Sequence, residues 1–143
     1  MNRINRFVLP VLWIIVCPAF AGVATNKPHL SGAAMEERLT VVTKDARATE
    51  AAIKSAKDVT FFCANCHGEG GNSNLPDVPN LAGQNPSYLL EQMYKFADGR
   101  RRNEFMQGLI KALSDEDKIN VSVYYANEKV VPAPVGNKVA VAL

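Results

Sequence analysis

The chain has 143 residues, of which 48% are hydrophobic and 21% charged, a composition that suits one folded domain and excludes an intrinsically disordered chain. Sixteen Lys and Arg residues against fourteen Asp and Glu residues give a net charge of +2, too small a basic excess for a typical nucleic-acid-binding protein. Three cysteines are too few for a disulfide-dense scaffold.

The N-terminus has the order of a secretory signal peptide. Two arginines precede an apolar run, 7–16, and small residues follow it up to Ala21. The run is shorter than the roughly 20 residues of a spanning helix, and prolines interrupt it. We expect cleavage after Ala21, or after Ala24 as second choice, a periplasmic location and no stable membrane span afterwards. An uncleaved N-terminal anchor is the alternative. Removing residues 1–21 takes away two Arg and no acid, so the mature charge is 14 − 14 = 0.

An N-terminal extension and an Ala-rich helix are expected after the signal peptide. Residues 22–44 are polar and mixed, and we interpret them as an extension or linker with a helix from about Met35. The next segment, 45–62, is rich in Ala. Its apolar residues recur at spacings of three and four from Ala52 to Cys63, which predicts one face of a helix.

A long loop and a second helix come next. Residues 68–85 are rich in Gly and Pro, and a loop of this length in a compact domain is expected to wrap around something. Asn85 and Pro86 suit the cap and the first turn of a helix. Gly99 can end that helix.

A second loop over 99–113 and a last helix complete the expected domain. Ser114 and the acid three residues later form a capping box, which predicts a helix to about Ala126. Prolines then break the chain into a tail, 128–143. Since no segment alternates as a strand does, the sequence predicts an all-α domain over 45–127.

One motif carries the chemistry, the run from Cys63 through Ala64, Asn65 and Cys66 to His67. C-x-x-C-H is typical of covalent haem c attachment, because two thiols one helical turn apart can each bond a haem vinyl group. His67 then lies beneath the iron as its proximal ligand. A thiol redox pair would need a βαβ context and a zinc site would need four ligands, so both are weaker interpretations.

Four residues could supply the second axial ligand: His29, Met35, Met93 and Met106. Met106 is favoured because it lies in the expected second loop, which can close over the opposite face of the haem. Met93 lies within the apolar stripe of a helix and suits core packing.

Several segments together resemble the class I c-type cytochromes, in particular small soluble bacterial members with one haem and one domain of the two-haem members. The resemblance covers about 45–127. Its segments are CANCHG (63–68), PNLAGQ (79–84), SYLLEQMYKFADGRR (87–101), FMQGLIKALSDEDK (105–118) and YYA (124–126).

The resemblance implies three to five helices packed around one covalently bound haem and its iron. It also implies His67 and Met106 as axial ligands, and a hydrogen bond from the His67 ring to the Pro79 carbonyl that fixes the ring. Lys118 stands where this family has an apolar residue. We expect its stem to cover the core while its ammonium group reaches water.

An apolar pocket is expected around the haem, with Gly68 letting the backbone pass close to the porphyrin edge. The candidate pocket residues are Gly68, Leu81, Tyr88, Leu89, Met93 and Phe105, with Phe61, Phe62 and Leu109 as further candidates.

Ligation by His and Met leaves no open position on the iron, so one-electron transfer is expected and an enzyme is not. The predicted function is a carrier between a membrane-bound quinol-oxidising complex and an oxidase or reductase. An electron-accepting subunit of a periplasmic dehydrogenase is the alternative, and a ligand-binding haem sensor is a third. Lys95 and Arg100–Arg102 have two interpretations of equal weight. They form a basic patch for an acidic partner or a haem propionate, or they belong to a solvated loop balanced by Asp98 and Glu104.

Overall fold

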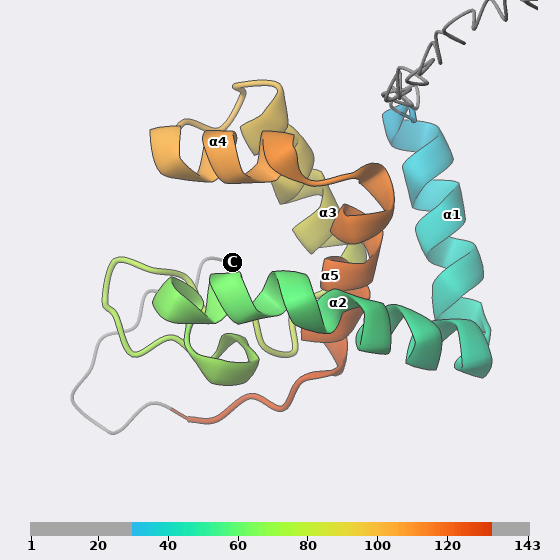
Figure 1. Ribbon diagram of the computed structural model, residues 1–143, viewed down its shortest axis with the longest axis horizontal. Helices are drawn as coiled ribbons and strands as arrows, with labels where there is room; N and C mark the ends of the chain where they lie inside the picture. The colour runs from blue at the N-terminus through green and yellow to red at the C-terminus, as the bar shows by residue number, and fades with distance from the viewer. Residues whose placement is uncertain (1–29, 133–143) are drawn as a thin grey trace, which may run out of the picture.

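The computed structural model describes residues 30–132 and contains five α-helices and one short 3-10 helix (Figure 1). The predicted signal peptide, His29 and the chain after Pro132 lie outside this range. The all-α prediction is confirmed, since the described residues contain no strand. None of the helices within this range is long and apolar enough to cross a membrane. The elements are α1 (Gly32–Lys44), α2 (Ala46–His67), η1 (Glu69–Gly71), α3 (Pro86–Ala97), α4 (Glu104–Ala112) and α5 (Asp115–Asn127).

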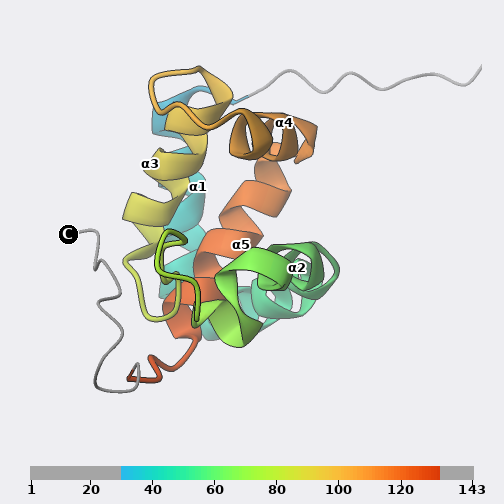
Figure 2. The same cartoon turned by 90° about the vertical axis from the view of Figure 1, so that its left-hand side faces the viewer.

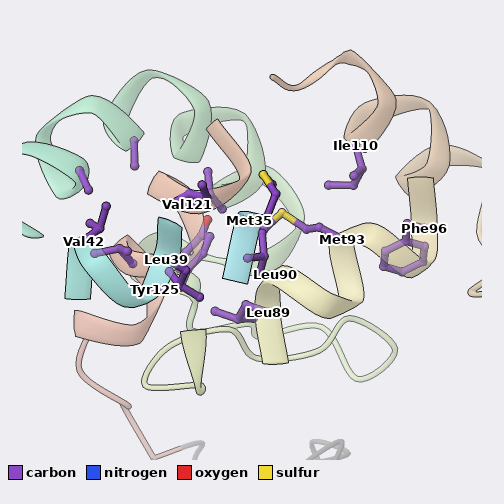
Figure 3. Packing of buried hydrophobic residues seen from close by; sticks show 14 residues of the cluster. Met35, Leu39, Val42, Leu89, Leu90, Met93, Phe96, Ile110, Val121 and Tyr125 are labelled. Atoms are coloured by element: carbon purple, nitrogen blue, oxygen red, sulfur yellow. The ribbon is translucent and has the colours of Figure 1, made fainter. Parts of the chain in front are cut away.

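Helix α1 begins within the expected extension and packs into the domain. The Ser31 hydroxyl caps it by accepting from the Ala34 N–H. Met35, Leu39 and Val42 recur at spacings of four and three, and each is at most 4% exposed. This face contacts α2, α3 and α5, and Figure 3 shows its side chains among those of α3 and α5. Residues 32–44 therefore close one side of the core.

Helix α5 lies at the centre of the bundle and contacts α1, α2 and α3 (Figure 2). Its most extensive contact is with α2. Two small residues, Ala52 and Ala56, are buried on α2 and let neighbouring helices approach it closely. The capping box predicted at Ser114 is confirmed, since the Ser114 hydroxyl accepts from the Asp117 N–H and the Asp117 carboxylate accepts from the Ser114 N–H.

The expected loop over 99–113 is partly wrong, because Glu104–Ala112 forms helix α4. Asn103 caps this helix through its side-chain oxygen, which accepts from the Met106 N–H at 3.0 Å. Helix α4 packs against α3, and three of its apolar residues are buried or half-buried: Met106, Leu109 and Ile110. A helix of nine residues is marginal by itself and forms here because it has this packing partner.

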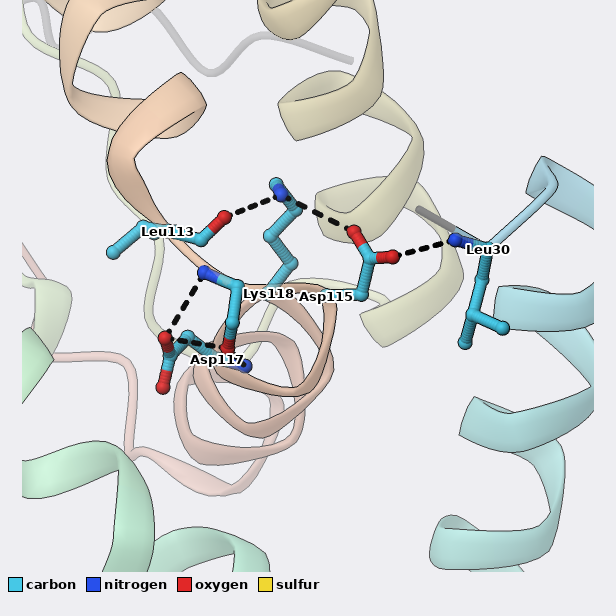
Figure 4. Close-up of polar contacts among 6 residues, drawn as sticks. Leu30, Leu113, Asp115, Asp117 and Lys118 are labelled. Carbon is cyan, nitrogen blue, oxygen red and sulfur yellow. Dashed lines mark hydrogen bonds and ion pairs between the residues drawn. The ribbon is translucent and has the colours of Figure 1, made fainter. Parts of the chain in front are cut away.

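The expectation for Lys118 is also wrong. The residue is 2% exposed, and its ammonium group donates to the Leu113 carbonyl at 2.7 Å and pairs with Asp115 at 3.4 Å (Figure 4). Asp115 in turn accepts from the Leu30 N–H at 2.6 Å. These partners replace water around the ammonium group, so the charge can stay inside the protein.

Candidate functional site

A cavity of about 370 Å³ lies between the C-terminal part of α2, the loop 77–84, α3, α4 and α5. Most of the site residues predicted from the sequence share its wall. They are Cys63, Cys66, His67, Pro79, Leu81, Tyr88, Leu89, Met93, Phe105 and Met106, together with the further candidates Phe62 and Leu109. Gly68, Phe61 and Met35 do not line it.

His67 is the last residue of α2 and is 8% exposed. Its Nδ1 lies 2.8 Å from the Pro79 carbonyl oxygen, and because a carbonyl oxygen only accepts, Nδ1 carries the proton and donates. Nε2 is left with a free lone pair at the wall of the cavity. Burial lowers the pKa of the ring, the hydrogen bond to the Pro79 carbonyl raises it, and the positive charge of Arg101 lowers it. The two lowering effects together are larger, so the pKa lies below its ordinary value. The ring is therefore neutral at pH 7, the form that binds a metal.

The two thiols lie on the turn of α2 that precedes His67. Cys63 is half-buried and Cys66 is exposed, and neither forms a disulfide. Burial raises the pKa of the Cys63 thiol, which lies near the Tyr125 hydroxyl. Both cysteines line the cavity, so two free thiols and a neutral imidazole lie within five successive residues at the end of α2.

Met106 is the third residue of α4 and is half-buried in the wall of the same cavity. Helix α4 lies across from the C-terminal half of α2 in both views (Figures 1 and 2). The cavity between these helices therefore has the His67 imidazole on one side and a thioether on an element that faces it. Of the alternative ligands, Met35 is fully buried in the core, while Met93 contributes to both core and cavity.

Gly68 and Gly71 turn the chain out of α2 and back toward the cavity. Both have positive φ, 77° and 82°. A Cβ on Gly68 would overlap the Asn72 carbonyl oxygen, and one on Gly71 would lie 2.7 Å from the Tyr125 ring. In the structure Gly68 therefore allows the chain to adopt the positive φ that this turn requires. The Gly71 carbonyl accepts from Leu81 at 2.8 Å, which holds the loop that carries Pro79 against the end of α2.

Three phenylalanines remain exposed near the cavity. Phe62 and Phe105 line it and are 66% and 69% exposed, and Phe61 packs edge-on against Phe62 with ring centroids 5.8 Å apart. We call these three residues the phenylalanine cluster. Phe62 and Phe105 share the cavity wall, and exposed apolar side chains beside a ligand cavity are typical of a contact site.

Gln92 and Phe96 are among the cavity-wall residues that sequence reasoning did not assign to the site. Together with the predicted Tyr88 they recur at a spacing of four along α3, so they share one face of that helix. That spacing was visible in the sequence, but a polar residue inside an apolar stripe was not recognised as part of the site.

The groups around the cavity fit a covalently bound haem. Two thiols one turn apart can form its thioether links, and a neutral imidazole and a thioether are the donors of the His/Met iron sites. The remaining wall is mostly apolar, which suits the porphyrin ring. By contrast, among residues 30–132 no three His, Cys, Asp or Glu side chains come together as a set of metal ligands.

Comparison with known proteins gives several relatives over this part of the chain, although no family model matches it. Cytochrome c4 of Pseudomonas aeruginosa is 44% identical over 82 residues, which are 57% of this chain and 40% of that protein. The thiosulfate dehydrogenase electron acceptor of Thiomonas intermedia is 39% identical over 79 residues, 52% of this chain and 36% of that protein. In both cases the chain spans well under half the length of the relative.

Cytochrome c-554(548) of Halomonas halodenitrificans is matched over nearly its whole length. It is 34% identical over 78 residues, which are 52% of this chain and 94% of that protein.

Proposed function

The chain belongs to the class I c-type cytochromes, whose cofactor is covalent haem c, and we propose that it is an exported carrier of single electrons with His67 and Met106 as axial ligands. The observation that carries the proposal is the cavity itself. It joins two thiols, a neutral imidazole and a thioether from facing helices in one mostly apolar wall.

Each residue has a distinct task in this proposal. Cys63 and Cys66 hold the group through thioether bonds, and the Pro79 carbonyl keeps the His67 ring in the orientation and tautomer that ligation needs. Once bound, haem c supplies a reversible one-electron couple at its iron. Two protein ligands fill both axial positions, so no substrate can bind there, and the apolar wall together with Met106 favours the ferrous state.

The phenylalanine cluster is the proposed contact for redox partners. It lies beside the cavity, and the chain without residues 1–21 has no net charge, so long-range attraction is weak. Apolar contact then contributes most of the binding. The proposed partners are a membrane-bound quinol-oxidising complex and an oxidase or reductase.

A second candidate is an electron-accepting subunit of a periplasmic dehydrogenase. One observation favours it, the similarity to the Thiomonas protein, which is named an electron acceptor of thiosulfate dehydrogenase. To compare the candidates, the ferric protein is mixed with purified thiosulfate dehydrogenase plus thiosulfate, or with quinol-reduced membranes. Rapid reduction by the membranes alone supports the carrier, and rapid reduction by the dehydrogenase supports the second candidate.

The visible spectrum of the full-length chain, exported in a host that attaches haem c, tests the site. We expect low-spin spectra in both oxidation states, a weak far-red band in the ferric form and no change with carbon monoxide. A high-spin spectrum that shifts with carbon monoxide would mean an open iron position and would remove Met106 as ligand. A chain that emerges without covalent haem would contradict the proposed function as a whole.

A further inference from the structure

Arg101 is fixed at the cavity wall by contacts to its side chain and its backbone. Its Nη1 donates to Gln92 at 3.0 Å, and its guanidinium group stacks over the Phe96 ring, 4.7 Å from the centroid. Its N–H donates to the Lys95 carbonyl at 2.8 Å, and its own carbonyl accepts from the Gln107 side chain at 3.4 Å. A long, flexible side chain is held here in one direction, which costs conformational entropy.

Arg100 and Lys95 have acidic partners, whereas Arg101 and Arg102 form no ion pair with any carboxylate in the described part of the chain. Both arginines line the cavity, but Arg102 is exposed and only Arg101 is half-buried. Arg100 pairs with Asp98 at 2.7 Å, and Lys95 pairs with Glu91 at 2.9 Å. The predicted basic patch therefore does not act as one unit. Arg101 is half-buried, and a partly buried charge is costly without an anion. The missing anion is expected to belong to whatever fills the cavity.

The free donors of Arg101 have the geometry that a carboxylate requires. Gln92 takes only Nη1, while Nε and Nη2 donate to no residue between 30 and 132. These two donors form one edge of the guanidinium fork, which binds both oxygens of a carboxylate side by side. Gln92 and Phe96 thus hold the group and leave its carboxylate-binding edge open.

Arg101 lines the same cavity as His67 and Met106. A fixed positive charge in this wall opposes the additional positive charge that an iron bound there would carry in its ferric form.

We propose that Arg101 is the anion-binding residue of the cavity and that it holds a carboxylate of the haem c propionate side chains through its free guanidinium edge. Gln92 and Phe96 position it for this contact. The proposal rests on the proposed function, since it requires haem c in the cavity. It follows that Arg101 raises the reduction potential of the haem.

Two glutamine substitutions test the proposal in the exported holoprotein. Arg101→Gln and Arg100→Gln remove the same charge from adjacent positions, but Arg100 is exposed and already paired with Asp98. After mass spectrometry confirms covalent haem, the reduction potential is measured by spectroelectrochemistry. The redox-difference infrared spectrum is recorded to follow the haem carboxylates. We expect Arg101→Gln to lower the potential clearly more than Arg100→Gln and to shift a carboxylate band that Arg100→Gln leaves in place.

Two further variants keep the test decisive if Arg101→Gln accumulates poorly. Arg101→Lys keeps the charge without the fork, so the carboxylate band shifts while most of the potential is retained. Gln92→Leu releases the guanidinium group, and we expect both readouts to move in the direction of Arg101→Gln by a smaller amount. If variants at Arg101 and Gln92 carry haem but keep the wild-type potential and carboxylate bands, Arg101 has no such role, and the electron-carrier proposal stands. Loss of haem from the wild-type chain would instead remove the proposed function.

Discussion

At His67, one backbone carbonyl decides which ring nitrogen is available. The Pro79 oxygen can only accept, so Nδ1 keeps the proton and Nε2 is the nitrogen left for a metal. The carbonyl is itself held in place, because the loop that carries it hydrogen-bonds to Gly71 next to the end of α2. The orientation of the His67 ring therefore depends on two backbone segments, the loop that carries Pro79 and the turn at Gly71.

Replacing Met106 tests the second axial position. Met106→Ala removes the thioether from the facing helix, so we expect a ferric spectrum without its far-red band, binding of carbon monoxide and a lower reduction potential. The matched control is Met93→Leu, a volume-conserving change of another methionine in the cavity wall that costs under about 1.5 kcal/mol. Equal spectra for Met106→Ala and the wild type would exclude Met106 as a ligand.

The raised pKa of Tyr94 predicts that the protein loses stability at high pH. Burial, with a smaller effect of Asp115, raises the pKa of Tyr94 to about 12 from its ordinary value of 10.0. The folded state holds the Tyr94 proton more tightly than the unfolded state does. The protonated hydroxyl therefore contributes fully to the free energy of unfolding below pH 10, and this contribution disappears as the pH rises toward 12.

Tyr94→Phe is the matched variant for that pH dependence. Within residues 30–132 the Tyr94 hydroxyl is buried without a hydrogen-bond partner, so at pH 7 we expect a change in the free energy of unfolding within about 1 kcal/mol. Urea unfolding between pH 9 and about pH 12 should show the wild type losing more stability than the variant. Parallel curves for the two proteins would refute the prediction.

Among the elements, α4 is the helix most dependent on its surroundings. It has nine residues, and its first turn is anchored where the Asn103 side chain accepts from the Met106 N–H. One cap therefore serves both the helix and the proposed ligand, and a change in the cap should affect both.

Asn103→Ala should lower the free energy of unfolding by about 1 kcal/mol, because one N–H of α4 loses its partner. We also expect the far-red ferric band to disappear at a lower temperature than in the wild type, since Met106 is held less firmly. Thermal unfolding and the temperature dependence of that band measure the two effects. Asn103→Ser, which keeps a capping oxygen, is the control and should lie close to the wild type in both measurements.

For the molecule as a whole, the contacts around Asp115 join the two ends of the described chain. Leu30 precedes α1, and its N–H donates to the carboxylate at the start of α5, whose other oxygen pairs with buried Lys118 (Figure 4). The first helix is thereby attached to the central one. Helix α1 and the buried lysine on α5 belong to one arrangement.

Lys118→Ala should lower the free energy of unfolding by about 3 kcal/mol, because it leaves the Leu113 carbonyl and Asp115 without their buried cation. Lys118→Met fills a similar volume without the charge and should cost less. Hydrogen exchange at α1 should increase in the alanine variant relative to α2. Unchanged protection of α1 in that variant would show that the contact does not hold the helix.

The features that the sequence predicted are local. C-x-x-C-H specifies its chemistry within one helical turn, the Ser114 box closes over three residues, and Asn85 with Pro86 begins α3 where expected. The Pro79 contact came from resemblance to a family, since twelve residues separate the donor and the acceptor. The pattern of α4 was present in its apolar residues, but a helix so short depends on its neighbours to form.

The sequence by itself determined the haem-binding motif, the all-α class and the helix caps, because these depend on spacings of a few residues. Tertiary structure alone decided the burial of Lys118, the packing of α1 and the open guanidinium edge of Arg101. Each depends on partners brought together by folding: Leu30 and Asp115 are 85 residues apart. Burial and the pairing of charges are properties of the space around a residue, and a sequence pattern does not describe that space.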